Sequence, residues 1–169
     1  MLKDAITLAN EGPVVIRYPK GKARSVDASD IGSGLAARKL LTDESNTVCI
    51  LAIGKMVGAS LDAAALLASK GIAATVWDVR SCAPLDQSMI ENASAHKVVV
   101  TVEDGIREGG IGMTIEDVVT HASGSNHPVV EVLGIPKQFI PQAKPDAILS
   151  RIGLDAEGIA TSVQKALAN

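Results

Sequence analysis

The chain has 169 residues, of which 47% are hydrophobic and 21% are charged, and its net charge is −3. A chain of this size can bury the core of one domain without needing a disulfide or a metal. The acidic balance and the presence of only three aromatic residues argue against a basic or stacking surface for nucleic acid. No apolar run approaches the ~18 residues of a membrane-spanning helix.

The first 18 residues predict a short helix followed by a strand. Residues 2–10 place apolar side chains at near-helical spacing, and Pro13 ends that helix because it has no N–H to continue it. The β-branched run PVVIRY at 13–18 is typical of a strand. From residue 19 to 33 the composition shifts to Lys, Arg, Gly, Ser and Asp without periodicity. We interpret 19–33 as a linker and 1–18 as a remnant of a preceding domain.

The remaining residues, 34–169, alternate between strand and helix patterns. Strands are expected at 34–41, 47–53, 72–79, 97–104 and 128–135, and helices at 56–70, 84–95, 109–122, 145–152 and 155–168. Helices of this length between Val- and Ile-rich strands indicate right-handed crossovers and a buried sheet. The sequence therefore predicts a three-layer α/β/α domain with a mostly parallel sheet.

The two cysteines, Cys49 and Cys82, are far apart and have no neighbouring histidine, so they match no zinc spacing. Cys49 lies in the apolar run TVCILAI and is expected in the core. Cys82 is interpreted as structural, with a partly exposed thiol as the alternative. Because no disulfide and no signal peptide are indicated, we expect a cytoplasmic protein.

No catalytic or metal-ligating constellation is predicted. The three histidines are scattered, and none shares a local motif with a Ser or Cys nucleophile. The segment GKARS at 21–25 lacks the upstream glycine and the following helix of a phosphate-binding P-loop. Carboxylates at ligand spacing and GDG-type thiamine diphosphate motifs are also absent from the sequence.

The richest local motif is VEDGIREGGIG at 102–112, which ends one predicted strand and opens the next predicted helix. Glycines permit a tight turn there, and exposed N–H groups at such a turn favour anions. The surrounding acidic side chains oppose an anionic ligand. A packed turn or a contact with another chain is favoured, and a small-molecule site stays open as the alternative. The residues concerned are Glu103, Asp104, Glu108, Gly109, Gly110 and Gly112.

Arg17 is the second informative position, at the end of the predicted strand in VVIRYPKG. A guanidinium beside a chain-reversing Pro and Gly is suited to bidentate phosphate binding. On the residues alone, a structural or surface role for Arg17 is favoured, and phosphate binding is the alternative.

Four segments taken together are similar to the end of the 1-deoxy-D-xylulose-5-phosphate synthase family, in the same order and spacing: GPVVIRYPKG, VWDVRSCAPLD, VTVEDGIREGGIG and GIPKQFIPQA with RIGLDAEGIA. This family belongs to the transketolase-like, thiamine-diphosphate-dependent enzymes. The resemblance implies a transketolase carboxy-terminal domain at 34–169. It also implies a full-length homodimeric transferase that joins pyruvate to glyceraldehyde 3-phosphate with loss of carbon dioxide, for isoprenoid, thiamine and pyridoxal precursors.

The resemblance further implies that thiamine diphosphate and magnesium bind upstream, so that this chain alone binds neither and is inactive. Arg17 matches the family arginine that contacts the phosphate of the acceptor. The family motif often has Arg where this chain has Lys20, which keeps the charge. The resemblance also favours an interface role for the loop, with Glu103, Asp104 and the glycines at 109, 110 and 112.

Two other interpretations stay open. The chain could be a free-standing α/β interaction or regulatory domain, although such a domain has no use for an extra helix and strand before a linker. It could also be the matching end of a 2-oxo acid dehydrogenase β subunit or of a split transketolase.

Overall fold

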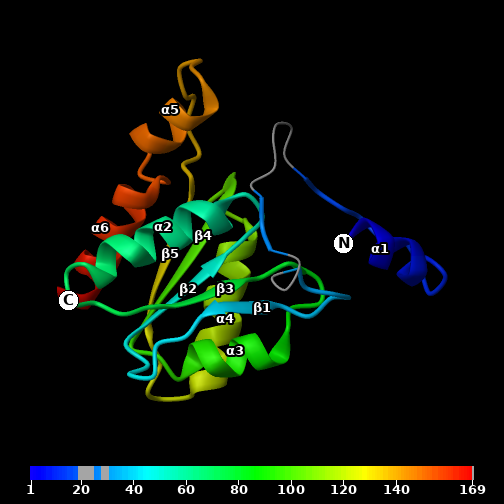
Figure 1. The fold of residues 1–169 in the computed structure, drawn as a ribbon, viewed down its shortest axis with the longest axis horizontal. Helices are drawn as coiled ribbons and strands as arrows, with labels where there is room; N and C mark the ends of the chain where they lie inside the picture. The colour runs from blue at the N-terminus through cyan, green and yellow to red at the C-terminus, as the bar shows by residue number, and fades with distance from the viewer. Residues whose placement is uncertain (19–24, 28–30, 169) are drawn as a thin grey trace.

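The computed structural model describes residues 1–18, 25–27 and 31–168. In these residues one sheet has the strand order β1-β3-β2-β4-β5, and β1 is antiparallel while the other strands are parallel (Figure 1). The strands are β1 (Arg38–Leu41), β2 (Val48–Ala52), β3 (Thr75–Asp78), β4 (Val98–Ile106) and β5 (Val129–Ile135). The predicted mostly parallel sheet is confirmed.

Helices cover both faces of the sheet. The helices of the described residues are α1 (Leu2–Leu8), α2 (Met56–Ala68), α3 (Gln87–Ser94), α4 (Ile111–Ser123), α5 (Pro145–Arg151) and α6 (Ala156–Ala168). One apolar cluster joins the sheet to α2 and α6, and a second joins it to α3 and α4. The predicted three-layer α/β/α architecture is therefore confirmed, and α1 lies to the side of the layers (Figure 1).

The central strand β2 shows how the sequence produces this sandwich. Val48 and Ile50 belong to the cluster beneath α2 and α6, whereas Cys49 and Leu51 belong to the cluster beneath α3 and α4. Side chains alternate between the two faces of a strand, so a strand covered on both faces must be apolar throughout. Cys49 is buried as expected, and this burial raises the pKa of its thiol.

Several element boundaries differ from the sequence prediction for local reasons. The strand expected at 34–41 forms only at Arg38–Leu41, where it pairs with the short β3. The helix expected at 84–95 begins at Gln87, because Asp86 is its N-cap and accepts a hydrogen bond from the Met89 N–H at 3.1 Å. An acceptor side chain at this position satisfies an N–H group that has no partner within the helix.

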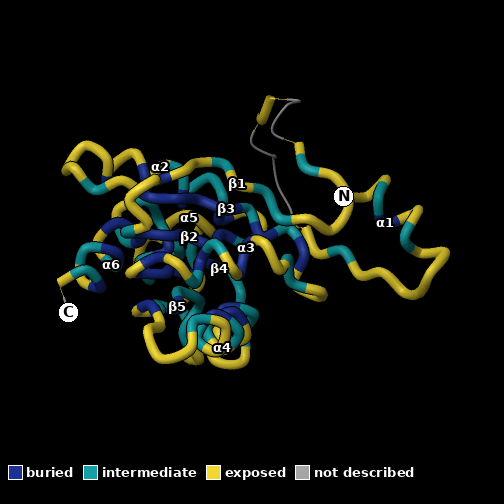
Figure 2. Tube along the Cα trace, turned by 90° about the horizontal axis from the view of Figure 1, so that it is seen from below, coloured by how far each residue is buried: buried dark blue, intermediate teal, exposed yellow. Residues whose placement is uncertain are grey.

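The strand predicted at 13–18 is wrong for this structure, because those residues are extended without strand pairing. A β-branched run fits a pleated sheet, but it forms a strand only when a neighbouring strand pairs with it. Val15 is instead 93% exposed, and the N-terminal segment is largely exposed in Figure 2. Part of the predicted linker, 19–24 and 28–30, lies outside the described residues.

Candidate functional site

An irregular segment of β4 places two carboxylates at the carboxyl edge of the sheet. Val102 pairs with Leu133 of β5 and Ile106 pairs with Ile135, with a shift of register between them. Three residues of β4, 103–105, therefore stand opposite a single residue of β5. Such a bulge redirects side chains and often occurs beside functional sites. Here it separates Glu103, which is buried, from Asp104, which is partly exposed.

Glu103 points into the protein and caps α4. Its side chain is 6% exposed, and its Oε1 accepts a hydrogen bond from the Gly112 N–H at 3.0 Å. Gly112 is the second residue of α4, where the N–H groups have no partners within the helix and the helix dipole favours a negative charge. The Glu103 carboxylate thus occupies the position that an anionic ligand would take at this helix end.

The glycines of the loop make room for that carboxylate. A Cβ atom at Gly110 would collide with Glu103 Oε1 and with the main-chain oxygen of Ile106. A Cβ atom at Gly105 would lie 2.7 Å from Glu103 Oε2, and one at Gly112 would lie 3.3 Å from Glu103 Oε1 and closer still to neighbouring side chains. The motif is therefore built around an internal cap, which supports the packed-turn interpretation over the small-molecule alternative.

Gly109 is needed for its backbone conformation rather than for space. Its φ of +77° lies in the left-handed region, and nothing lies within 4 Å of where its Cβ would stand. A residue with a side chain would be strained there by its backbone rather than by its neighbours. The turn into α4 depends on this conformation.

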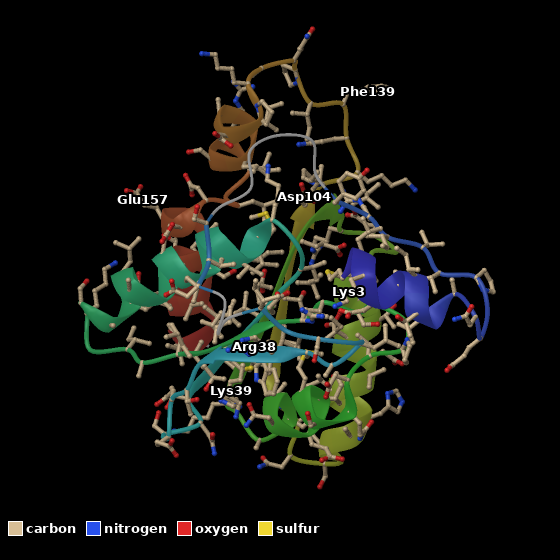
Figure 3. All side chains as sticks on the ribbon, turned by 45° about the vertical axis from the view of Figure 1, so that its right-hand side comes forward. Lys3, Arg38, Lys39, Asp104, Phe139 and Glu157 are labelled. Carbon is tan, nitrogen blue, oxygen red and sulfur yellow. The ribbon has the colours of Figure 1, made fainter. Side chains whose placement is uncertain are left out.

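Asp104 points the other way and binds Arg17. Arg17 donates from Nη1 to Asp104 Oδ1 at 3.1 Å and from Nη2 to the Asp104 main-chain oxygen at 3.1 Å. On the other side, Lys55 Nζ lies 4.0 Å from Asp104 Oδ2. The structure therefore brings Arg17 and the predicted loop together, although 87 residues separate them in sequence. Figure 3 labels Asp104 near the start of α2.

Cys82 lies at the same edge of the sheet and is exposed. Partial burial of its sulfur raises the pKa of the thiol, the Glu103 carboxylate raises it further, and Arg17 opposes both. The thiol is consequently protonated at neutral pH and is a poor nucleophile.

Arg80 was not predicted from the sequence as a site residue, yet it attaches the N-terminal segment to the sheet. Its guanidinium donates from Nε to the Ala36 oxygen at 2.9 Å and from Nη2 to the Gly34 oxygen at 3.0 Å. Asp4 Oδ2 lies 3.9 Å from Arg80 Nη2 and accepts the Gly34 N–H at 3.2 Å. The only sequence signal was its place directly after a predicted strand.

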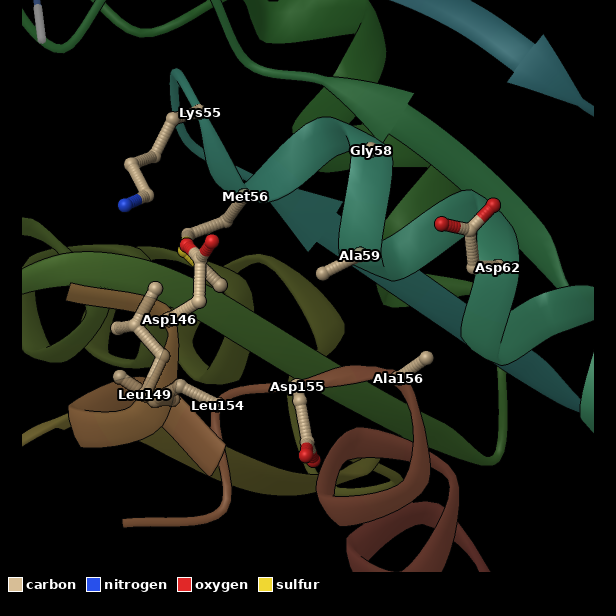
Figure 4. A pocket seen from close by; sticks show the side chains of 10 residues that line it. All are labelled: Lys55, Met56, Gly58, Ala59, Asp62, Asp146, Leu149, Leu154, Asp155 and Ala156. Atoms are coloured by element: carbon tan, nitrogen blue, oxygen red, sulfur yellow. The ribbon is translucent and has the colours of Figure 1, made fainter. Parts of the chain in front are cut away.

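A hollow of about 310 Å³ lies between the start of α2 and the α5–α6 region (Figure 4). Its lining includes Lys55 and three carboxylates, from Asp62, Asp146 and Asp155. Among the described residues, no group of three or more His, Cys, Asp or Glu is placed to hold a metal ion. In the same residues no helix has the length and apolar character needed to cross a membrane.

These residues do not fit thiamine diphosphate with its magnesium. A magnesium-bound diphosphate is typically held by carboxylates that bind the metal and by free N–H groups at a helix N-terminus. In the described part of the chain, no carboxylate cluster is arranged for a metal, and the α4 end is occupied by Glu103.

Comparison with known families identifies the class of this fold. Residues 38–159 match the family model of the transketolase C-terminal domain. The chain belongs to the transketolase C-terminal domain family.

Curated relatives point to one branch of it. The chain is 40% identical over 154 residues to 1-deoxy-D-xylulose-5-phosphate synthase 1 of Kitasatospora griseola, covering 89% of this chain and 23% of that protein. It is 34% identical over 166 residues to the 1-deoxy-D-xylulose-5-phosphate synthase of Renibacterium salmoninarum, covering 96% of this chain and 25% of that protein. The chain spans about a quarter of the length of these relatives.

Solved structures agree on the fold. A split-gene transketolase, described as an inactive tetramer, is 31% identical to this chain with a TM-score of 0.75. The match covers 86% of this chain and 46% of that one. The R525L mutant transketolase of Pichia stipitis is 20% identical with a TM-score of 0.55. The match covers 79% of this chain and 18% of that one, and it shows likeness of fold alone.

Proposed function

We propose that this chain forms the carboxy-terminal part of a 1-deoxy-D-xylulose-5-phosphate synthase. The complete enzyme joins pyruvate to glyceraldehyde 3-phosphate with loss of carbon dioxide and supplies isoprenoid, thiamine and pyridoxal precursors. The observation that carries the proposal is the extent of the match. The family model begins at residue 38, whereas a curated synthase from Renibacterium salmoninarum matches 96% of the chain, which includes most of the residues before 38.

In this proposal Arg17 binds the phosphate of the acceptor aldehyde. The guanidinium carries five N–H donors, and its contacts with Asp104 leave several of them for a second anion. The side chain is 72% exposed, so the donors that do not bind Asp104 are accessible from outside the domain. Lys20, the neighbouring cation of the motif, lies outside the described residues.

Thiamine diphosphate and magnesium belong to the remainder of the enzyme in this proposal. The described residues do not fit either group, so the isolated chain is expected to bind neither and to have no synthase activity. The split-gene transketolase provides a parallel, because that partial chain is described as an inactive tetramer.

The carboxyl edge and the N-terminal segment serve as contact surfaces in the complete enzyme, which we propose to be a cytoplasmic homodimer. Residues 1–18 belong to the preceding domain, and the extended run 13–18 pairs with that domain's sheet. The loop 103–112 contributes Asp104, Gly109 and Gly110 to the interface, whereas Gly112 is buried within α4. Glu103, which points inward, maintains the shape of the loop.

The source DNA provides the first test. A reading frame that continues upstream for several hundred codons and contains a GDG motif supports the proposal. A separate neighbouring gene with that motif supports a split enzyme instead, which the split-gene relative makes the second candidate.

The second test measures activity. The chain alone and the chain assembled with the thiamine-binding part are each supplied with pyruvate, glyceraldehyde 3-phosphate, thiamine diphosphate and magnesium. Formation of 1-deoxy-D-xylulose 5-phosphate by the assembly alone is the expected result. Activity of the isolated chain, or micromolar binding of thiamine diphosphate to it in a calorimetric titration, would contradict the proposal.

A further inference from the structure

Arg17 is held at the sheet edge by both the side chain and the main chain of Asp104. Its Nη1 donates to the carboxylate and its Nη2 donates to the carbonyl oxygen of the same residue, each at 3.1 Å. Two bonds to one residue fix the plane of the guanidinium as well as its position. This restraint matters because the rest of the Arg17 side chain is largely exposed and would otherwise sample many rotamers.

Main-chain hydrogen bonds on both sides hold Asp104 in place. The irregular part of β4 is anchored on one side by the Ile53 N–H, which donates to the Val102 oxygen at 2.9 Å. It is anchored on the other side by the Arg107 N–H, which donates to the Ile135 oxygen at 2.8 Å. The Asp104 carboxylate is 21% exposed and therefore has little freedom to follow a moving arginine.

Lys55 completes the arrangement. Its ammonium lies 4.0 Å from Asp104 Oδ2, on the oxygen that Arg17 does not use. A lone carboxylate beside a phosphate would repel it, whereas a carboxylate paired with a second cation repels it less. The three groups together carry a net positive charge.

From this geometry we infer that Asp104 is the positioning residue for Arg17, and that Lys55 offsets the charge of Asp104. The inference rests on the proposed function. Asp104 holds the guanidinium in one orientation, so that its remaining N–H donors bind the phosphate of the acceptor without first losing rotamer freedom. Asp104 acts through Arg17 and touches neither the carbonyl of the acceptor nor pyruvate.

The test uses the assembled enzyme with Asp104→Ala, Asp104→Asn and, as a matched control, Glu108→Gln, which changes an exposed acid in the same loop. Asp104→Ala should raise the KM for glyceraldehyde 3-phosphate about tenfold and leave kcat within about twofold, since the restraint rather than the binding group is lost. Asp104→Asn keeps an acceptor oxygen, so its KM for glyceraldehyde 3-phosphate should lie between those of the wild type and Asp104→Ala. The KM for pyruvate and for a phosphate-free aldehyde should be unchanged.

A double-mutant cycle separates positioning from general damage. If Asp104 acts through Arg17, Asp104→Ala should have no further effect in an Arg17→Ala background. An additive effect there, or an equal loss with the phosphate-free aldehyde, would overturn the inference. Lys55→Gln should raise the KM for the phosphorylated acceptor alone, because the Asp104 charge is then left uncompensated.

A measurement on this chain by itself keeps the inference independent of activity. The N–H signals of the Arg17 guanidinium should show restricted rotation by NMR, and Asp104→Ala should abolish it. Identical spectra for the two proteins would overturn the inference. If the wild-type assembly makes no product, the proposed function fails; if it is active and Asp104→Ala behaves as wild type, only the positioning role fails.

Discussion

Replacing Glu103 with Ala tests whether the acidic glycine-rich loop is built around an internal helix cap. The change removes the carboxylate that accepts the Gly112 N–H at 3.0 Å. A hydrogen bond to a charged group contributes about 1.5–3 kcal/mol, and a charge at a helix N-terminus contributes about 0.3–1 kcal/mol in an overlapping way. We expect Glu103→Ala to lower the free energy of unfolding by about 2–3 kcal/mol, or the Tm by roughly 4–12 °C.

Urea unfolding followed by the fluorescence of Trp77 is a suitable assay, because Trp77 is the single tryptophan and is buried in the core. Glu103→Gln keeps an acceptor oxygen and should lose only about 1 kcal/mol, the part that depends on the charge. The exposed Glu108 provides the control, and Glu108→Ala should have no measurable effect.

A further consequence distinguishes the cap from ordinary packing. Glu103→Ala leaves N–H groups at the start of α4 without an acceptor, so sulfate or phosphate should stabilise the variant more than the wild type. If the variant is as stable as the wild type and indifferent to these anions, Glu103 does not cap α4. The close approach of the glycines to its carboxylate would then need another explanation.

Arg17, Gly110 and His96 each provide one further prediction. Arg17→Ala in the assembled enzyme should lower kcat/KM for glyceraldehyde 3-phosphate by roughly 10- to 150-fold and hardly change the KM for pyruvate; equal loss with a phosphate-free acceptor would make Arg17 structural. Gly110→Ala should cost about 1–3 kcal/mol in urea unfolding, because the main-chain oxygen it meets is less able to move than a flexible side chain. Burial lowers the pKa of His96 below its ordinary 6.5, despite the opposing Asn92 carbonyl and Asp43 carboxylate. The unfolded chain therefore takes up the proton first, so stability should decline as the pH falls below about 6.5, and His96→Gln should flatten that decline in urea titrations.

The layered core could be predicted because its signal is repeated along the chain. β2 is a short run of apolar residues and β4 begins with one, and the parallel strands β2, β3 and β4 are followed by the helices α2, α3 and α4. Helix starts were less predictable, since the start of α3 depends on one Asp86 side chain rather than on periodicity.

The N-terminal strand could not be judged from its own residues. PVVIRY has the composition of a strand, but pairing depends on an available neighbour, and in this structure 13–18 has none. The contacts of Arg17 with Asp104 and of Arg80 with the residues at 34–36 are equally non-local. Sequence spacing carries no information about such pairs, because the fold alone brings their elements together.

The acidic residues of the loop at 103–108 oppose a phosphate at this edge only where their charges are unpaired. In the structure, Glu103 and Asp104 are each paired with a positive group. Glu103 and Asp104 are neighbours in sequence, but the irregular part of β4 directs them to different partners. The charge of Glu103 is offset by the positive end of α4, and the charge of Asp104 lies between Arg17 and Lys55. At Arg17 an approaching dianion therefore meets two cations and one carboxylate that is already paired, and Glu108 is the remaining exposed acid of the loop. The acidic loop is thus compatible with a phosphate beside Arg17, because each of these two acids neutralises or positions a positive group of the same chain.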